Sequence, residues 1–269
     1  MTELASIGSN HMRALILKNV SKSFGGIDAV KDVDLVINAG ESRALIGPNG
    51  AGKTTLYNLI TGEIRLDRGE VFLFDINLTY EPIGKRIQLG MGRTYQMSNL
   101  FQELTVQENL FLAAWKQKEV SASVTAILFR SWRKFNDQCY RVTKIAQQVG
   151  LEEKLNVPVN ELSHGEHRQL ELGITLAHDP KILLLDEPMA GLSATERSFM
   201  TQQIIGLKSK ITIVIIEHDI DVAFSIADQV SVLHQGSIVA EGSPEQIRAN
   251  PLVQEIYTLS RNSNGHRHG

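Results

Sequence analysis

Short apolar runs, separated by turn residues and helical patterns, recur along this chain. The runs Arg43–Ile46, Ile182–Leu185 and Ile211–Ile216 are almost wholly apolar, which is typical of strands buried on both faces of a sheet. Helical patterns lie between these runs. The pattern therefore predicts an α/β core with a mixed, mainly parallel sheet and helices on both faces.

A second set of strands alternates apolar and polar residues more loosely. Ala14–Val20 has the pattern of an edge strand, and Val33–Ile37 and Val71–Phe74 continue the alternation after turn residues. These three segments predict an antiparallel β flap attached to the core.

The middle of the chain favours helices. Thr105 and Glu108 form a capping-box pair that opens an amphipathic helix through Trp115. A second helix is predicted over Arg133–Val149, while serines and a threonine weaken a helical interpretation of Lys116–Trp132. These segments predict an α-helical subdomain inserted into the core.

The patterns place one domain between two polar tails. A disordered tail or cloning remnant is predicted at 1–12 and a disordered tail at 261–269. The single domain between them, at 13–260, consists of two parts. They are the core with its flap (13–95 and 178–260) and the helical subdomain (96–177).

Composition and charge narrow the class of protein. The chain has 269 residues, 42% hydrophobic and 21% charged, which is ordinary for a globular protein large enough for a full core. A formal net charge of −3 gives no electrostatic reason to expect nucleic acid as a partner. The single cysteine, Cys139, excludes an internal disulfide and fits a reducing cytosol. No apolar run approaches the roughly 18 residues that span a bilayer, so we expect any membrane attachment to go through a partner.

The stretch Gly47–Thr55, GPNGAGKTT, fits the phosphate-loop pattern G-x-x-x-x-G-K-[ST]. Its glycines let backbone N–H groups point at an anion, and the helix predicted over Lys53–Ile60 directs its positive dipole end at the phosphates. A glycine-rich turn without a ligand is the alternative, which the flanking strand and helix disfavour. Lys53 is expected to reach the β- and γ-phosphates and Thr54 to bind Mg²⁺. The loop residues expected to contact the nucleotide are Gly47, Asn49, Gly50, Ala51, Gly52, Lys53, Thr54 and Thr55.

Two adjacent carboxylates follow the strand predicted at Ile182–Leu185. Asp186 stands at the strand tip, where it can hold Mg²⁺. Glu187 can instead face an attacking water and accept its proton, because successive strand residues point to different sides. An acidic turn after a strand is the alternative, which the upstream phosphate loop disfavours.

Two further residues are ambiguous by pattern alone. Phe24, in the sequence SFGG, can stack on an adenine at the end of the flap, but periodicity favours a core aromatic. His218 ends a strand and precedes a helix that begins near Asp219, where a lone histidine is usually a satisfied surface group.

Six motifs in order make the chain resemble the ATPase subunits of ATP-binding cassette (ABC) transporters. Besides the phosphate loop, they are Gln96 in the Q-loop position, LSHGE as the signature, LLLDEP as Walker B, AGLS as the D-loop and IEHD as the switch. The resemblance covers about Ala14–Leu259 and implies ATP and Mg²⁺ as cofactors, with Phe24 stacking on the adenine. The catalytic residues that it implies are Lys53, Gln96, Glu187 and His218, and the Mg²⁺ ligands are Thr54, Gln96 and Asp186.

The resemblance also implies partners. In that family two cassettes meet head to tail, so Ser163 and Gly165 of one subunit contact the nucleotide of the other. One set of motifs per chain implies a homodimer, or a heterodimer with a related subunit. Permease subunits are expected at the groove of Gln96–Phe101, with an indirect link to an extracytoplasmic solute-binding protein. The expected location is cytoplasmic, peripheral on the inner face of the cell membrane.

Two motifs depart from the family pattern. The usual signature is LSGGQ, whereas His164 and Glu166 stand in two of its positions here. Ser163 and Glu166 form a capping box, and a carboxylate aimed at a γ-phosphate would be repelled, so we expect Glu166 to cap the helix. In the D-loop, Ser193 replaces the usual aspartate and opens a second capping pair with Glu196.

The segments GRTYQMSNLFQELTVQENL and EGSPEQIRANPLVQEIYTL resemble the cassettes of branched-chain amino acid uptake systems, whose relatives move urea, short amides and some aromatic acids. The resemblance therefore implies the motor subunit of an importer. A lipopolysaccharide-type export cassette and a soluble ABC ATPase of DNA repair or translation are the alternatives. The stretch between Lys53 and Ser163 is too short for the long coiled coil of repair ATPases, and translation-type members usually carry two cassettes. A guanine-nucleotide switch is disfavoured because no N-K-x-D motif occurs.

Overall fold

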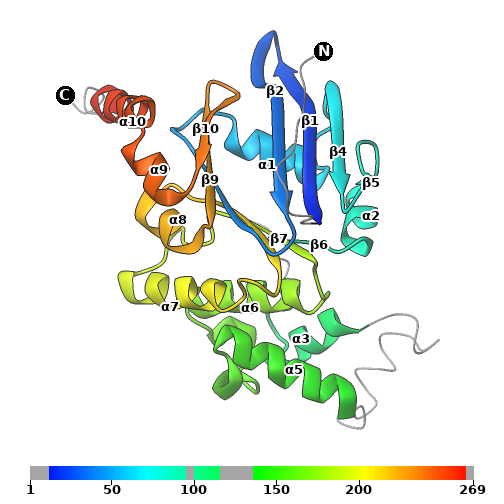
Figure 1. Ribbon diagram of the computed structural model, residues 1–269. Helices are drawn as coiled ribbons and strands as arrows, with labels where there is room; N and C mark the ends of the chain where they lie inside the picture. The colour runs from blue at the N-terminus through cyan, green and yellow to red at the C-terminus, as the bar shows by residue number, and fades with distance from the viewer. Residues whose placement is uncertain (1–11, 95–99, 116–135, 265–269) are drawn as a thin grey trace.

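Figure 1 shows the computed structural model of the chain, which describes residues 12–94, 100–115 and 136–264. Three predicted parts therefore lie outside the described residues: the tail before Met12, Gln96 and the whole of Lys116–Trp132. The strands are β1 (Arg13–Phe24), β2 (Ile27–Asn38), β3 (Ser42–Ile46), β4 (Arg68–Leu73), β5 (Ile76–Asn77), β6 (Met91–Arg93), β7 (Ile182–Asp186), β8 (Thr212–Ile216), β9 (Gln229–His234) and β10 (Ser237–Gly242). The helices are α1 (Lys53–Thr61), α2 (Ile83–Gln88), α3 (Val106–Ala114), α5 (Asn136–Val149), α6 (His164–Leu176), α7 (Ala194–Ile205), α8 (Ile220–Ile226), α9 (Pro244–Ala249) and α10 (Pro251–Asn264), with short 3-10 helices at Glu152–Lys154 and Val159–Glu161.

The larger sheet has six strands in the order β10-β9-β3-β8-β7-β6. Strands β6, β7, β8, β3 and β9 run parallel, and β10 pairs with β9 in antiparallel fashion. Every residue of β3 and β8 is buried, which matches the apolar runs at 44–46 and 213–216. The prediction of a mixed, mainly parallel sheet is confirmed.

The smaller sheet is the antiparallel flap, with its strands in the order β2-β1-β4-β5. The prediction that Ala14–Val20 forms an edge strand is wrong, because β1 lies between β2 and β4 and buries Leu15 and Leu17. The pairing of β1 shifts register between Leu17 and Val20, near Asn19, which has a φ of 48°. This irregularity breaks the strict alternation by which an interior strand is recognised in sequence.

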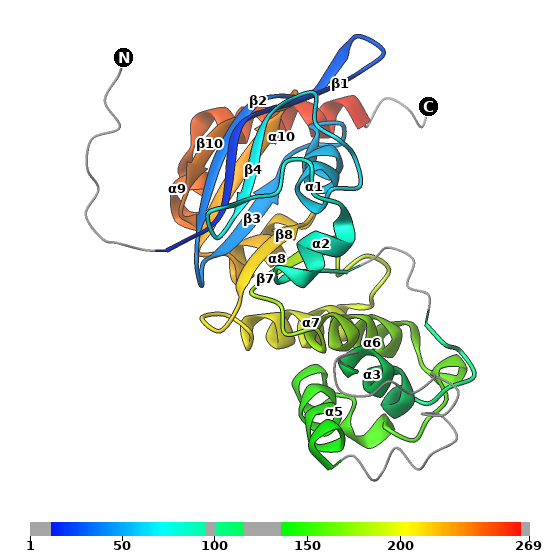
Figure 2. The same ribbon diagram turned by 90° about the vertical axis from the view of Figure 1, so that its right-hand side faces the viewer.

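Two apolar clusters cover opposite faces of the larger sheet. Leu45 and Val214 belong to the cluster that holds α1 and the flap, whereas their neighbours Ala44 and Ile213 belong to the cluster that holds α3, α5, α6, α7 and α8. Successive strand residues point to opposite faces, so helices cover both sides of the sheet. Helices α3 and α5 lie at the opposite end of the molecule from β1, β2 and β4 (Figures 1 and 2).

Local capping signals set most helix boundaries. Capping boxes at Thr105, Ser163 and Ser193 begin α3, α6 and α7, as predicted. Gly62 ends α1 in the left-handed conformation. The terminal helix α10 continues to Asn264, so the first part of the tail predicted at 261–269 is helical.

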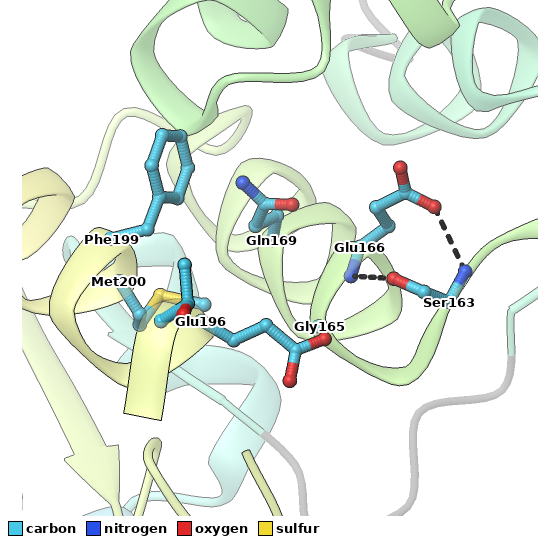
Figure 3. Close-up of a pocket in the computed structure, with 8 residues that line it drawn as sticks. Ser163, Gly165, Glu166, Gln169, Glu196, Phe199 and Met200 are labelled. Carbon is cyan, nitrogen blue, oxygen red and sulfur yellow. Dashed lines mark hydrogen bonds between the residues drawn. The ribbon is translucent and has the colours of Figure 1, made fainter. Parts of the chain in front are cut away.

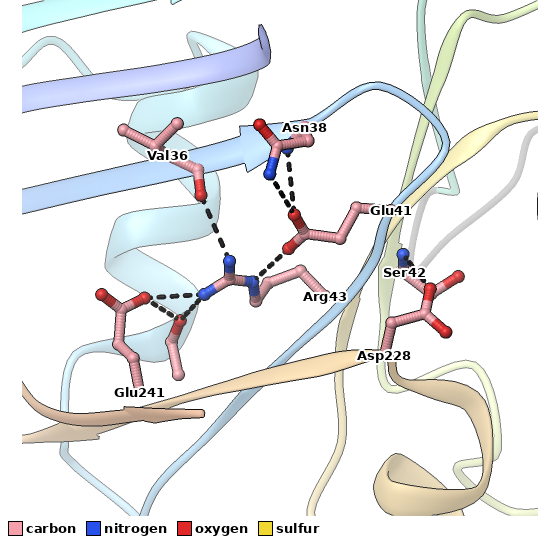
Figure 4. A network of polar contacts seen from close by, with 8 residues as sticks. Val36, Asn38, Glu41, Ser42, Arg43, Asp228 and Glu241 are labelled. Atoms are coloured by element: carbon pink, nitrogen blue, oxygen red, sulfur yellow. Dashed lines mark hydrogen bonds and ion pairs between the residues drawn. The ribbon is translucent and has the colours of Figure 1, made fainter. Parts of the chain in front are cut away.

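A buried arginine joins the two sheets (Figure 4). Arg43 of β3 is 7% exposed, and its guanidinium donates to Glu41 Oε1 at 2.6 Å and to the Val36 carbonyl at 3.2 Å. It also donates to Ser231 Oγ at 2.9 Å and Glu241 Oε1 at 2.7 Å. One side chain thus ties β2 of the flap to β3, β9 and β10 of the larger sheet.

Candidate functional site

The phosphate loop connects β3 to α1, and its glycines are required by close backbone approaches. Gly47 and Gly52 have φ angles of 156° and 106°. A Cβ atom would lie 2.2 Å from the Leu233 carbonyl oxygen at Gly47, and 2.3 Å from the Ala29 carbonyl oxygen at Gly52. No other residue fits these two positions, so the loop is shaped by β9 on one side and β2 on the other.

Lys53, the first residue of α1, folds back over the loop. It is 5% exposed, and its Nζ donates to the Gly47 carbonyl at 2.7 Å and the Pro48 carbonyl at 3.1 Å. Burial lowers the pKa of Lys53, while the charges of Glu187 and Asp186 act in the opposite direction. A phosphate would offer this ammonium charged acceptors, which form stronger hydrogen bonds than neutral carbonyls do.

Asp186 ends β7 within the electrostatic reach of Lys53. Burial raises the pKa of Asp186 to about 6, helped by Glu187 and opposed by Arg93 and Lys53. Its Oδ1 is buried and has no hydrogen-bond partner among the residues that the structure describes. A buried carboxylate oxygen with this unmet need fits a cation, and Thr54 stands exposed at the start of α1 as a second oxygen donor.

A divalent cation at this site would depend on ligands from outside the protein. Over the described ranges, no three His, Cys, Asp or Glu side chains form a metal-binding group by themselves. Mg²⁺ commonly takes one or two protein ligands and completes its shell with water and phosphate oxygens. Asp186 and Thr54 match that habit, while the third predicted ligand, Gln96, lies outside the described residues.

Glu187 and His218 form a close pair at the ends of adjacent strands. Glu187 Oε1 and His218 Nε2 are 2.7 Å apart. They meet because β7 and β8 run parallel, with Asp186 opposite Ile216 as the last pair, so both chains leave the sheet at the same edge. Glu187 has a φ of 48°, which is uncommon for a residue other than glycine. The structure therefore brings together four of the predicted residues, Lys53, Asp186, Glu187 and His218.

A buried carboxyl group beside this pair escaped the sequence analysis. Glu217 is 5% exposed, and its Oε1 accepts a hydrogen bond from the Met189 N–H at 3.1 Å. Burial raises the pKa of Glu217 to about 7, against hydrogen bonds from the Met189 and His218 backbones that lower it. The available signal in the sequence is a carboxylate placed directly after the apolar run Ile211–Ile216.

Phe24 lies at the turn between β1 and β2 and is 48% exposed, so the interpretation of Phe24 as a core aromatic is wrong. Periodicity cannot separate the tip of a hairpin from its buried middle. The Lys22 Nζ lies 5.4 Å from the centre of the ring. An exposed ring at the end of the flap is free to stack on a base, and its contact with adenine stays a prediction.

The signature segment begins α6 with the capping box that its sequence predicts (Figure 3). Ser163 Oγ accepts from the Glu166 N–H at 3.2 Å, and Glu166 Oε2 accepts from the Ser163 N–H at 2.8 Å. The interpretation of Glu166 as a cap is confirmed. The segment opens into a cavity of about 310 Å³ between α6 and α7, lined by Ser163, Gly165, Glu166, Gln169, Thr195, Glu196, Phe199 and Met200.

The D-loop and the signature helix touch each other within the chain. Glu196 caps α7 by accepting from the Ser193 N–H at 2.9 Å, and its Oε1 lies 2.5 Å from the position that a Cβ atom on Gly165 would take. His164 Nε2 lies 2.9 Å from the position of a Cβ atom on Gly191. Gly165, whose N–H the resemblance directs at a nucleotide of another subunit, thus packs against the Glu196 carboxylate.

The terminal helix α10 packs beside the phosphate loop, which the sequence analysis also missed. Burial raises the pKa of Tyr257 to about 12, and a backbone hydrogen bond from Gly47 acts against that rise. A cavity of about 570 Å³ lies between the loop and the helix, lined by Pro48, Asn49, Gly50, Ala51, His234, Gln235, Leu252, Glu255, Ile256 and Leu259. Tyr257 follows the helix period of α10, and nothing in its local sequence indicates a partner so far away in the chain.

Comparisons with known proteins agree with this arrangement. Residues 30–190 match the family described as ABC transporter, and residues 237–258 match the family described as Branched-chain amino acid ATP-binding cassette transporter. The chain is 36% identical over 246 residues to the high-affinity branched-chain amino acid transport ATP-binding protein LivG of Escherichia coli (strain K12). The aligned region covers 90% of this chain and 96% of LivG.

Solved structures show the same fold. The ADP conformation of an ATP-binding cassette of an ABC transporter superposes with a TM-score of 0.79 and 31% identity, covering 92% of this chain and 99% of that chain. A dimeric bacterial ABC transporter cassette superposes with a TM-score of 0.71 and 27% identity, covering 86% of this chain and 98% of that chain. The matched residues include the phosphate loop and the Asp186–Glu187 pair, so the chain belongs to the ABC transporter family, as an ATP-binding subunit that hydrolyses ATP.

Proposed function

We propose that this chain powers the uptake of branched-chain amino acids, or of related small solutes such as urea and short amides, through partner permeases. The observation that carries the substrate class is the match of residues 237–258, from β10 into α10, to the branched-chain transporter family. The name of the LivG relative supports the same class. Both favour import over the alternatives of an export cassette and a soluble ABC ATPase.

Permease subunits supply the path across the membrane in this proposal. No helix in the part of the chain that the structure describes is both long and apolar enough to cross a bilayer. The proposed docking groove at Gln96–Phe101 lies partly outside the described residues, but Phe101 at its end is 57% exposed, which supports an apolar contact. The subunit is then peripheral on the cytoplasmic face of the membrane.

The site residues suggest a division of labour in hydrolysis. Lys53 binds the β- and γ-phosphates. The Glu187 carboxylate accepts a proton from a water molecule while the oxygen of that water attacks the γ-phosphorus. The bond between the γ-phosphorus and the β-phosphate oxygen breaks in the same step. His218, 2.7 Å from Glu187, orients that carboxylate and contacts the γ-phosphate. Asp186 and Thr54 hold Mg²⁺, which when bound neutralises charge on the phosphates.

A second cassette completes each site. The chain carries one phosphate loop and one signature, and a related cassette is described as dimeric, which supports a head-to-tail dimer with a second copy or a related subunit. Ser163 at the start of α6 then approaches the nucleotide of the other subunit. In this arrangement the N–H of Gly165, which packs against Glu196, donates to a phosphate of that nucleotide.

The substitution Glu187→Gln tests the catalytic assignment. General-base catalysis contributes roughly 10²- to 10⁴-fold, so we expect turnover to fall by that factor while ATP affinity stays within about twofold. The measurements are steady-state ATPase rates and equilibrium binding of a fluorescent ATP analogue, with exposed Glu153→Gln as the matched control. An equal loss of nucleotide affinity would contradict the role of Glu187.

The transported solute can be tested in cells of the organism that carries the gene. Introducing Glu187→Gln at the chromosomal locus should abolish uptake of radiolabelled leucine, isoleucine and valine. Loss of urea or amide uptake with intact leucine uptake would assign the related solute class instead. Unchanged uptake of all these solutes would refute the importer assignment.

A further inference from the structure

We propose that Glu217 is a positioning residue for ATP hydrolysis, whose buried carboxylate holds the turn that carries Glu187. This inference rests on the proposed role of Glu187 as the general base. The role is one of positioning because the Glu217 Oε1 accepts from the Met189 N–H of that turn.

The turn after β7 needs an anchor of this kind. Glu187 adopts a φ of 48°, and strained backbone persists only where its surroundings hold it in place. The Glu187 N–H is fixed to the Ile216 carbonyl at 2.9 Å. The next residue, Pro188, has no N–H, so the Met189 N–H is the first donor that can tether the far side of the turn.

Glu217 is placed to accept from that donor. It follows β8, in which every residue is buried, and it is itself 5% exposed. Burying a carboxyl group is costly unless the group satisfies a buried hydrogen-bonding partner, and here it receives the Met189 N–H at 3.1 Å. An apolar side chain would avoid the cost of burial but leave that N–H without an acceptor.

Glu217 and His218, which directly follow β8, thus hold the catalytic turn at two points. His218 Nε2 fixes the Glu187 carboxylate at 2.7 Å, and Glu217 fixes the backbone two residues further on. Without the hydrogen bond to Glu217, the Glu187 and His218 side chains are still present, but the strained turn that carries Glu187 is free to move. Small misplacements of a catalytic group can cost on the order of 10²-fold in rate.

Three substitutions at Glu217 separate anchoring from packing. Glu217→Gln keeps an oxygen that can accept from the Met189 N–H, whereas Glu217→Ala removes it and Glu217→Leu removes it while filling the space. For Ala and Leu we expect kcat to fall at least about tenfold with KM for ATP within about twofold, and for Gln we expect kcat within about threefold of wild type. Exposed Glu153→Ala is the matched control.

Hydrogen exchange of the full chain gives a readout that does not depend on turnover. Amides of the segment 187–192 should exchange at least about tenfold faster in the Ala and Leu variants, but not in the Gln variant. The proposal is overturned if Ala and Leu leave kcat and exchange unchanged, if KM rises as much as kcat falls, or if Gln is as impaired as Leu. Glu187→Gln in the same assay separates the two hypotheses, because full turnover there would refute the general base whatever the Glu217 variants do.

Discussion

At the scale of single residues, two carboxyl groups at the ends of β7 and β8 are buried well enough to raise their pKa values, Asp186 to about 6 and Glu217 to about 7. The two groups differ in what their surroundings offer. Asp186 keeps a buried oxygen without a partner among the described residues, which suits a cation, whereas Glu217 receives a backbone N–H. Asp186 is therefore suited to bind a ligand, and Glu217 is suited to bind the backbone.

The raised pKa of Glu217 makes stability depend on pH. A carboxyl group whose pKa is higher in the folded chain than its ordinary 4.5 stabilises the fold below pH 4.5, and this contribution is lost as pH rises through about 7. The glutamine of Glu217→Gln cannot ionise, so its stability does not fall in this way. The unfolding free energy of the variant minus that of wild type should therefore be larger at pH 8 than at pH 5, by on the order of 2 to 3 kcal/mol. Urea denaturation at both pH values measures this difference.

The pKa of Asp186 is raised as well, but Asp186 is present in both the wild-type protein and the variant, so its contribution cancels from the comparison. A difference between the Glu217→Gln and wild-type stabilities that does not change between pH 5 and pH 8 would contradict the raised pKa. Exposed Glu153→Gln should show no such pH dependence.

Which residues could be recognised from sequence depends on how local their task is. Gly47, Gly52 and Lys53 serve one loop, so their spacing alone carries the information. Glu217 and Tyr257 act on segments that are distant in sequence, the turn after β7 and the phosphate loop. Periodicity indicates only that Glu217 lies at a strand end and Tyr257 on a helix, because the tertiary fold determines their partners.

At the scale of elements, capping boxes are the clearest case of local information. Thr105, Ser163 and Ser193 each bond a glutamate three residues later, so the starts of α3, α6 and α7 follow from four-residue patterns. Strand order does not, which is why β1 was expected at an edge and lies inside the flap. Pairing between strands is a long-range property, and the bulges of β1 disguise it further.

The capping role of Glu166 predicts a mild effect of its isosteric amide. In Glu166→Gln the remaining oxygen can still accept from the Ser163 N–H, and the lost ion pair with Lys154 is partly exposed and contributes little. ATPase activity should stay within about threefold of wild type. A loss comparable to that of Glu187→Gln would overturn the assignment of Glu166 as a cap.

The Arg43 network predicts a large effect on stability. Arg43→Met leaves the buried Ser231 and the mostly buried Glu41 without their cation, so the unfolding free energy should fall by about 2 to 3 kcal/mol. Arg68→Met is the matched control. Its ion pair with Asp32, at 3.4 Å, is exposed, and its loss should cost less than about 1 kcal/mol. Equal losses in guanidinium denaturation would contradict a structural role for the network.

At the scale of the whole molecule, the contact between α6 and α7 links two motifs that serve different sites in a head-to-tail dimer. The Glu196 carboxylate of the D-loop helix packs against Gly165 of the signature helix within one chain. The two motifs are therefore in direct contact within one chain.

A head-to-tail dimer predicts complementation between two inactive variants. Lys53→Ala removes the phosphate-binding lysine, and Ser163→Arg obstructs the signature. In a mixed dimer both defects fall on one site, and the other site is intact. If the sites act independently, an equimolar mixture should regain about a quarter of wild-type ATPase activity, since half of the dimers are mixed. Mixing either variant with the Lys53→Ala, Ser163→Arg double variant should restore nothing, and the absence of recovery in the first mixture would argue against shared sites.

The position of β3 in the sheet has a consequence for how the chain is made. β3 leads into the phosphate loop, but its partners are β8 and β9, with Ser42 opposite Ile213 and Arg43 opposite Gln229. A ribosome must therefore synthesise most of the protein before the loop, encoded near the beginning, gains the walls that shape it. ATP binds only the finished fold, so it can stabilise the completed subunit but cannot assist the nascent chain.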